Sequence, residues 1–160
     1  MIILSIVACL SKDPIAKEFP TILDPLESIR VGLPEGSGYP ESIVMLSEDT
    51  EEYAWVHARG YLHVSLEEAW TAVRNDLVYV NQRTVDSYTV TEVDAEEYDY
   101  IFVVENEVQD IVPVAFTNEW RHAGNLNDKS EVSDVVIRWQ KIEGTNFIQL
   151  MEGSVEILPV

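Results

Sequence analysis

The chain has 160 residues, a length that suits one domain, and 46% of them are hydrophobic, which is sufficient for a packed core. It carries 10 Lys and Arg residues against 29 Asp and Glu residues, so its formal net charge is -19. This excess of carboxylates argues against a nucleic-acid partner and against attachment to anionic lipid through a basic surface, and we interpret it mainly as favouring solubility.

The first ten residues, MIILSIVACL, form an uncharged apolar run that is too short to span a bilayer as a helix. Residues 6–9, Ile-Val-Ala-Cys, resemble a bacterial lipobox, in which the cysteine is lipidated and becomes the mature N-terminus. The resemblance implies a lipoprotein signal segment at residues 1–9, a lipid anchor on Cys9, and a place in the bacterial cell envelope, in the periplasm or on the outer surface. The alternative is a buried N-terminal strand with an incidental cysteine, because no Lys or Arg precedes the run.

Residues 10–50 are rich in proline and glycine and predict a tether with one or two short ordered pieces. Within it, residues 42–46 are apolar enough to form a short strand or a helical turn. The folded domain is then expected to occupy residues 51–160.

Residues 52–64 alternate over a length that is typical of a β-strand, with Trp55, His57 and Arg59 on one face. A short helix is expected next, because Ser65 and Glu68 form the S-x-x-E pattern of a capping box.

The helix should present one apolar stripe, since Leu66, Ala69, Trp70 and Val73 follow helical spacing. We expect Trp70 to anchor it in the core, and the helix to end near residues 75–76.

Five further strands are predicted at residues 79–93, 98–108, 111–122, 132–142 and 146–157. Tight connections between them favour an antiparallel meander. The fold class is therefore α+β: a curved antiparallel sheet with a short helix after the first strand of the domain, residues 52–64. One face of the sheet is large and apolar and requires a cover.

The order of strand, capped helix and long meander resembles the START-like, or Bet v 1-like, helix-grip superfamily, whose bacterial members are called SRPBCC or polyketide cyclase-like proteins. The matching text is VSLEEAWTAVRN at residues 64–75 and NFIQLMEGSVEILPV at residues 146–160, and the resemblance spans residues 53–160. It implies a sheet that grips a long C-terminal helix around a hydrophobic cavity, and binding or transport of a lipid or another apolar molecule. Because the sequence ends before such a helix, we expect an incomplete helix grip. Three alternatives stay open: the gene is truncated, residues 11–47 take the place of the helix, or a partner chain covers the sheet.

No motif of a catalytic centre, a cofactor site or a metal site is present. His57 and His63 share a strand face but lie about 20 Å apart along it, so they cannot bind one metal ion together. A site formed by His122 and a carboxylate is the weaker alternative to surface histidines that are solvated or hydrogen-bonded. No serine occupies a G-x-S-x-G elbow.

The sequence therefore predicts a membrane-tethered, non-catalytic domain that binds or carries a hydrophobic small molecule or lipid. The expected contacts are the aromatic side chains Phe102, Phe116, Trp120, Trp139 and Phe147, with Arg59 orienting a ligand carboxylate or head group. The alternatives are that the aromatic side chains are plain core and that Arg59 pairs with an acid on a neighbouring strand. Two other functions stay open: a protein-interaction module that uses the uncovered sheet face or its edge, including a homodimer, and a cyclase-like enzyme. A further alternative is a degraded gene fragment with no function of its own.

Overall fold

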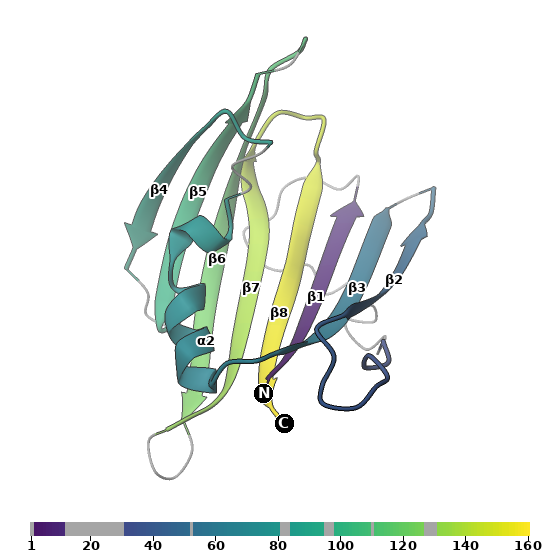
Figure 1. The fold of residues 1–160 in the computed structure, drawn as a ribbon. Coiled ribbons are helices and arrows are strands. Elements are labelled where there is room, and N and C mark those ends of the chain that lie inside the picture. Colours follow the sequence, from purple (N-terminus) through teal and green to yellow (C-terminus); the bar gives the residue numbers. More distant parts are fainter. Residues whose placement is uncertain are drawn as a thin grey trace.

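The computed structural model describes residues 2–11, 31–51, 53–80, 84–94, 98–109, 111–126 and 131–160. These residues form one eight-stranded sheet with the order β2-β3-β1-β8-β7-β6-β5-β4, in which all neighbouring strands are antiparallel (Figure 1). The strands are β1 (Ile2–Ser11), β2 (Ile43–Asp49), β3 (Ala54–Leu62), β4 (Ser87–Val93), β5 (Tyr100–Val108), β6 (Val114–Leu126), β7 (Val132–Gly144) and β8 (Leu150–Pro159). The helices of the described residues are α2 (Leu66–Val73) and a short 3-10 helix, η2 (Asp76–Val78).

The predicted meander is confirmed, because β4 to β8 follow one another in both sequence and space. The prediction of a strand from residue 79 is wrong at its start: η2 follows the helix, and β4 begins only at Ser87. The reason is local packing. Tyr79 turns towards the helix and its hydroxyl donates a hydrogen bond to the Val73 carbonyl, 2.7 Å away, while Val80 is buried.

Two strands lie N-terminal to residue 51. The segment predicted as a short strand or turn forms β2, which pairs with β3. Residues 2–11 form β1, which pairs with β3 on one side and β8 on the other, so the backbone of Cys9 lies between those of Trp55 and Glu152. Residues 12–30 of the predicted tether lie outside the described residues, and the lipobox interpretation of residues 6–9 stays a prediction.

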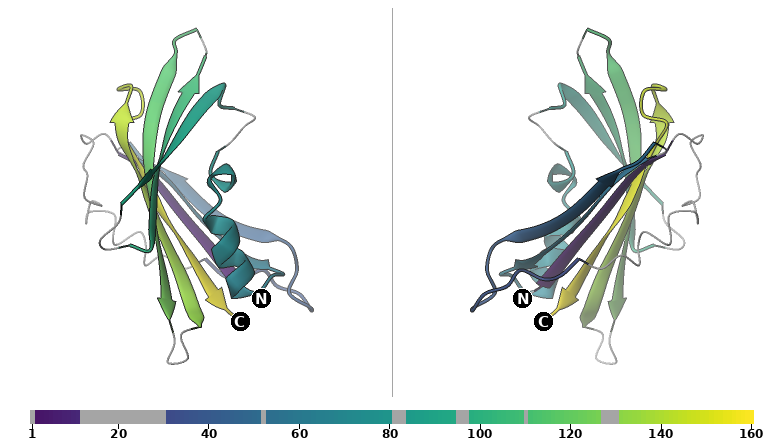
Figure 2. Two further views of the ribbon diagram at one scale, coloured as in Figure 1. Left: turned by 90° about the vertical axis from the view of Figure 1, so that its left-hand side faces the viewer. Right: turned by 90° about the vertical axis from the view of Figure 1, so that its right-hand side faces the viewer.

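Helix α2 begins as the sequence predicts. The Ser65 hydroxyl accepts a hydrogen bond from the Glu68 backbone, and the Glu68 carboxylate accepts one from the Ser65 backbone at 2.8 Å, which satisfies free backbone donors of the first turn. The helix lies on the inner side of the curved sheet (Figure 2). Its buried residues Leu66 and Ala69 pack against β7 and β8, in a core that contains Val135, Ile137, Val155 and Ile157.

A glycine on β6 allows the helix to approach the sheet closely. A Cβ atom at Gly124 would lie 3.3 Å from Cζ2 of Trp70, so the indole rests directly on this strand. The guanidinium of Arg74 lies over the indole, with its central carbon 4.9 Å from the ring centroid. Trp70 therefore anchors the helix to the sheet, as its position in the apolar stripe predicts.

Candidate ligand-binding face

An aromatic cluster lies on the inner face of the sheet beside α2. Tyr79 stands over Trp120 with ring centroids 4.2 Å apart, and Trp120 stacks on Trp139 at 5.2 Å. Phe102 stacks on His122, also at 5.2 Å. Since Tyr79 comes from the segment after the helix and the other rings come from β5, β6 and β7, the chain covers this part of its own apolar face.

A hydrogen-bonded pair holds the cluster together. The Tyr79 hydroxyl donates to the Val73 carbonyl at 2.7 Å, and its oxygen lies 3.0 Å from Nε2 of His122. Because the hydroxyl hydrogen is already used, Nε2 must be the donor of the second bond, which assigns the proton of the neutral ring to Nε2. Burial lowers the pKa of His122 to about 4, against smaller opposing effects of the backbone at Tyr100 and Val73.

The expectation of surface histidines is wrong for two of the three. His122 is completely buried, and His57 is 3% exposed with its ring edge-on to Trp55 at 5.0 Å. Burial also lowers the pKa of His57. Both histidines occur in strands whose polar and apolar residues alternate. This pattern assigns each histidine to one of the two faces of its strand, but it does not show whether that face is buried. Only His63 is exposed, with Nε2 2.7 Å from the Tyr39 carbonyl oxygen.

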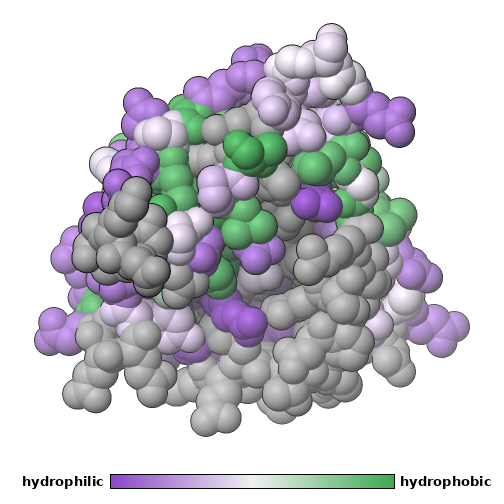
Figure 3. Space-filling view, turned by 90° about the horizontal axis from the view of Figure 1, so that it is seen from below, coloured by the Kyte–Doolittle hydropathy of each residue, from purple (hydrophilic) through white to green (hydrophobic). Residues whose placement is uncertain are grey.

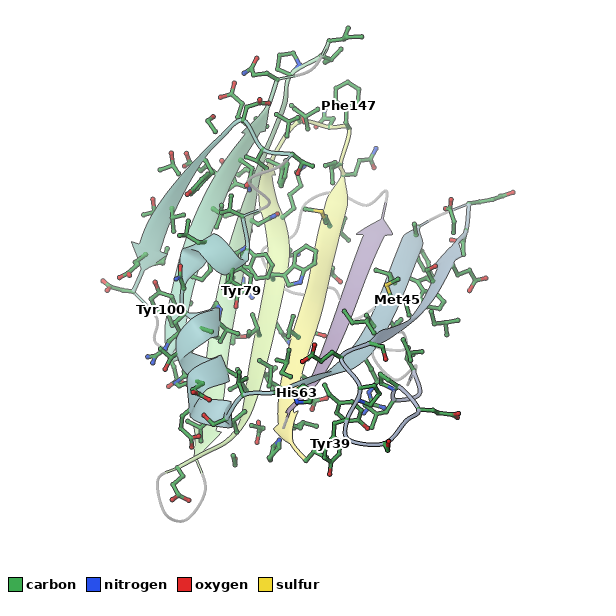
Figure 4. The ribbon with its side chains drawn as sticks, in the orientation of Figure 1. Tyr39, Met45, His63, Tyr79, Tyr100 and Phe147 are labelled. Atoms are coloured by element: carbon green, nitrogen blue, oxygen red, sulfur yellow. The ribbon has the colours of Figure 1, made fainter. Side chains whose placement is uncertain are left out.

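The structure brings together three of the five predicted aromatic contacts. Phe102, Trp120 and Trp139 belong to the cluster, and Phe102 and Trp139 are buried within it. Phe116 lies farther along β6, where it lines a separate pocket of about 390 Å³ together with Glu105 and Glu107. Phe147 is 71% exposed in the turn between β7 and β8 and points away from the cluster (Figure 4).

Arg59 lies on the opposite face of the sheet. Leu62 packs against the core of α2, and side chains three positions apart on a strand point to opposite sides, so Arg59 faces away from the helix. Its guanidinium donates a hydrogen bond to the Val31 carbonyl at 2.9 Å. Tyr39 reaches the same face and contacts Tyr61 at 5.3 Å, so residues 31–40 cover this part of β3.

Sequence reasoning missed Lys141, which is completely buried on the inner face of β7. Its ammonium group donates hydrogen bonds to the carbonyls of Thr145, at 3.1 Å, and of Ile148. Burial lowers its pKa. The signal was present in the alternation Val135, Ile137, Trp139, Lys141, because every second residue of the strand shares one face. Lys141 thus joins the following turn to the sheet.

Among the described residues, no helix or strand covers the inner face between α2 and the edge strand β2. Met45 of β2 lies directly opposite Ala58 of β3, which lies opposite Ile6 of β1, which in turn lies opposite Val155 of β8. Residues that lie directly opposite each other share one face of a sheet, and Val155 belongs to the core under α2. Met45 and Ile43 therefore face the same side as α2, and they are 68% and 63% exposed. We call this region, bounded by α2 and β2, the trough; three strand spacings separate β8 from β2, or about 14 Å.

The trough is apolar around Ile43 and Met45, and Ser47 and Asp49 follow on the same side of β2. Val56 and Ala58 form its described floor on β3 and are half-buried, while Met45 stands at its outer side (Figure 4). Seen from below, hydrophobic residues form separate groups in the middle and on one side of the molecule, interrupted by hydrophilic residues (Figure 3). The arrangement can bind apolar surface.

Comparisons of this chain with protein-family models, with curated proteins and with solved structures gave no match. The resemblance to the helix-grip superfamily thus stays a prediction, while the coarser class, an antiparallel sheet with one short helix, is confirmed. Among the described residues, no three His, Cys, Asp or Glu side chains are placed to hold a metal ion. In the same part of the chain, no helix combines the length and apolarity needed to cross a membrane.

Proposed function

We propose that this domain is a non-catalytic binding domain that takes an elongated apolar molecule, such as a lipid chain, into the trough. The observation that carries the proposal is the exposure of Ile43 and Met45 on the same side as α2. Large aliphatic side chains that face the inside of a curved sheet and remain exposed mark a surface that gains free energy when it is covered.

The size of the effect can be estimated from area. Ile43 and Met45 together present roughly 200 Å² of apolar surface, whose burial would contribute about 5 kcal/mol at about 25 cal/mol per Å². On its own this corresponds to a Kd of about 10⁻⁴ M, before the loss of ligand freedom is counted. Tighter binding requires that the same molecule also contacts the open flank of α2.

The aromatic cluster has a supporting role in this proposal. Its rings are already packed against each other by Tyr79, so Phe102 and Trp139 stiffen the sheet below the helix instead of contacting the ligand. Arg59 is not proposed as a head-group contact, because it lies on the opposite face. The trough recognises apolar shape alone.

Envelope localisation through a lipid on Cys9 is a second proposal, independent of the trough. Cleavage before Cys9 would remove residues 2–8 from β1, which pairs with β3 and β8, so processing and an intact β1 exclude each other. The intact mass of the protein isolated from a bacterial host decides between them. A mass that starts at Cys9 with added acyl chains supports the anchor, and a mass that includes residues 2–8 removes it.

The trough is tested with a neutral probe, a pyrene-labelled monoacylglycerol, titrated against the full chain. Ala58→Glu places a carboxylate on the trough floor and should raise the Kd by about tenfold or more, because an unpaired charge resists burial. Thr89→Glu adds the same charge to β4, at the far edge of the sheet, and should leave the Kd unchanged. Equal affinities of these two variants, both folded by circular dichroism, would remove the proposal.

A second candidate function, an interaction module, is favoured by a different observation: β2 is an edge strand with apolar side chains on both faces.

A further inference from the structure

The outer edge of β2 carries a row of backbone groups whose direction follows from the register. The Thr50 amide donates to the Tyr53 carbonyl at 2.9 Å, and the pairing continues as Asp49 with Ala54. In an antiparallel ladder, hydrogen-bonded and non-bonded pairs alternate. Val44, Leu46 and Glu48 therefore bond to β3, whereas the amides and carbonyls of Ile43, Met45 and Ser47 point outward. In the described part of the chain, no strand pairs with that side.

The first four residues of this edge lack the features that normally prevent strand addition, whereas its end carries the charged residues Glu48 and Asp49. Edge strands are usually interrupted by proline, lysine or a bulge. Residues 43–46 read Ile-Val-Met-Leu, all seven residues of β2 are exposed, and its pairing with β3 has no register shift. The opposite edge of the sheet differs, because every second residue at the start of β4 is polar: Ser87, Thr89 and Thr91. Of the two edges, β2 is the apolar one.

Charge indicates what kind of chain would pair there. Glu41, Glu48, Asp49 and Glu51 are exposed around the apolar centre of β2. The base nearest in register is Arg59, whose guanidinium is turned to the Val31 carbonyl on the face away from α2. A second copy would bring another net charge of -19 to this edge. An extended segment with an apolar centre and basic ends complements both features.

We propose that β2 accepts an extended, basic segment of a partner protein as an additional antiparallel or parallel strand. The outward backbone groups of Ile43, Met45 and Ser47 supply the hydrogen bonds, and the carboxylates at both ends of β2 supply the preference for basic partners. This interaction surface is separate from lipid binding in the trough, since it uses the edge of the sheet instead of its inner face.

The probe is a fluorescent peptide, KKVTVTVKK, whose affinity for the full chain is measured by anisotropy beside its acidic counterpart EEVTVTVEE. We expect the basic peptide to bind about tenfold more tightly or better, and its affinity to fall as salt is raised. Hydrogen exchange should slow at the amides of Ile43, Met45 and Ser47 when it binds. Equal affinity for the two peptides would overturn the proposal.

Matched variants separate the contribution of the backbone amide to peptide binding from that of the side chain. Met45→Pro removes an outward amide but no hydrogen bond to β3, so the fold should persist while the Kd rises about tenfold. Met45→Ala loses the same side chain but keeps the amide, and should bind the peptide nearly as well as the original chain. Ser47→Pro repeats the test at a second outward amide if Met45→Pro fails to fold. Peptide binding that survives a folded proline variant would overturn the edge geometry.

Two further measurements distinguish peptide binding at the β2 edge from lipid binding in the trough and from dimerisation. Ala58→Glu should lose the pyrene-labelled lipid and keep the peptide, because Ala58 lies on the trough floor and not at the edge; loss of both ligands would overturn the separation of the two surfaces. Sedimentation equilibrium should show a monomer. A dimer that Met45→Pro dissociates would replace the basic partner by a second copy of this chain.

Discussion

Removal of one hydroxyl group tests the packing of the inner face. Tyr79→Phe leaves the shape of the ring unchanged, so it creates almost no cavity, but it removes the donor to the Val73 carbonyl and the acceptor for Nε2 of His122. The imidazole N–H then loses its hydroxyl acceptor in a residue that is fully inaccessible to solvent. A buried polar group left unsatisfied costs about 1–3 kcal/mol, and we expect the free energy of unfolding to fall by that amount.

A double-mutant cycle makes this prediction specific. His122→Phe removes the other partner, and in the double variant Tyr79→Phe/His122→Phe no imidazole N–H remains to be satisfied. Replacing both partners by apolar rings is expected to cost less than the sum of the single changes, by about 1 kcal/mol or more. Urea unfolding followed by tryptophan fluorescence measures all four proteins, since Trp120 lies 4.2 Å from Tyr79. Single effects that add within about 0.5 kcal/mol would refute the hydrogen bond as the source of stability.

Three further predictions concern stability. Burial lowers the pKa of His122 in the folded state to about 4, so the unfolded chain binds a proton first as the pH falls, and the stability present above pH 6.5 is lost between pH 6.5 and 4. At pH 5 the free energy of unfolding should be about 2 kcal/mol lower than above pH 6.5, and this loss should be absent from His122→Phe when urea titrations above pH 6.5 and at pH 5 are compared. Trp70→Ala should lower the free energy of unfolding by about 3–5 kcal/mol, and a loss below about 1 kcal/mol would show that α2 does not depend on this contact. Gly144→Ala should cost at least about 1 kcal/mol, measured as a fall in Tm, because Gly144 has φ 131° and a Cβ atom there would lie 2.6 Å from the Cα atom of Phe116.

Much of the local structure could be predicted because the signals are short in range. The capping box at Ser65 and Glu68 lies within one helical turn, and it starts α2 as expected. Strand alternation correctly groups Tyr100, Phe102 and Val104 on one face of β5, and Val135, Ile137 and Trp139 on one face of β7. In the sheet, the two groups lie on the same inner face. These patterns depend on the geometry of a single helix or strand, which adjacent residues determine.

The sequence did not indicate which part of the chain packs against each strand face. Alternation assigns Arg59 and Leu62 to opposite faces of β3, but only the docking of α2 shows that Leu62 is the inner one. In the same way, Tyr79 fills the space over Trp120 because the chain turns back after the helix, which strand periodicity cannot indicate.

From the sequence alone we could predict the fold class, the acidic character of the chain, and the positions of the helix and most strands. We could not predict that β1 lies between β3 and β8, that His122 and Lys141 are buried, or that no described strand pairs with the apolar outer edge of β2. The physical reason is that strand order and burial arise from contacts between residues far apart in the chain. Those contacts depend on which surfaces remain uncovered after the local elements have formed.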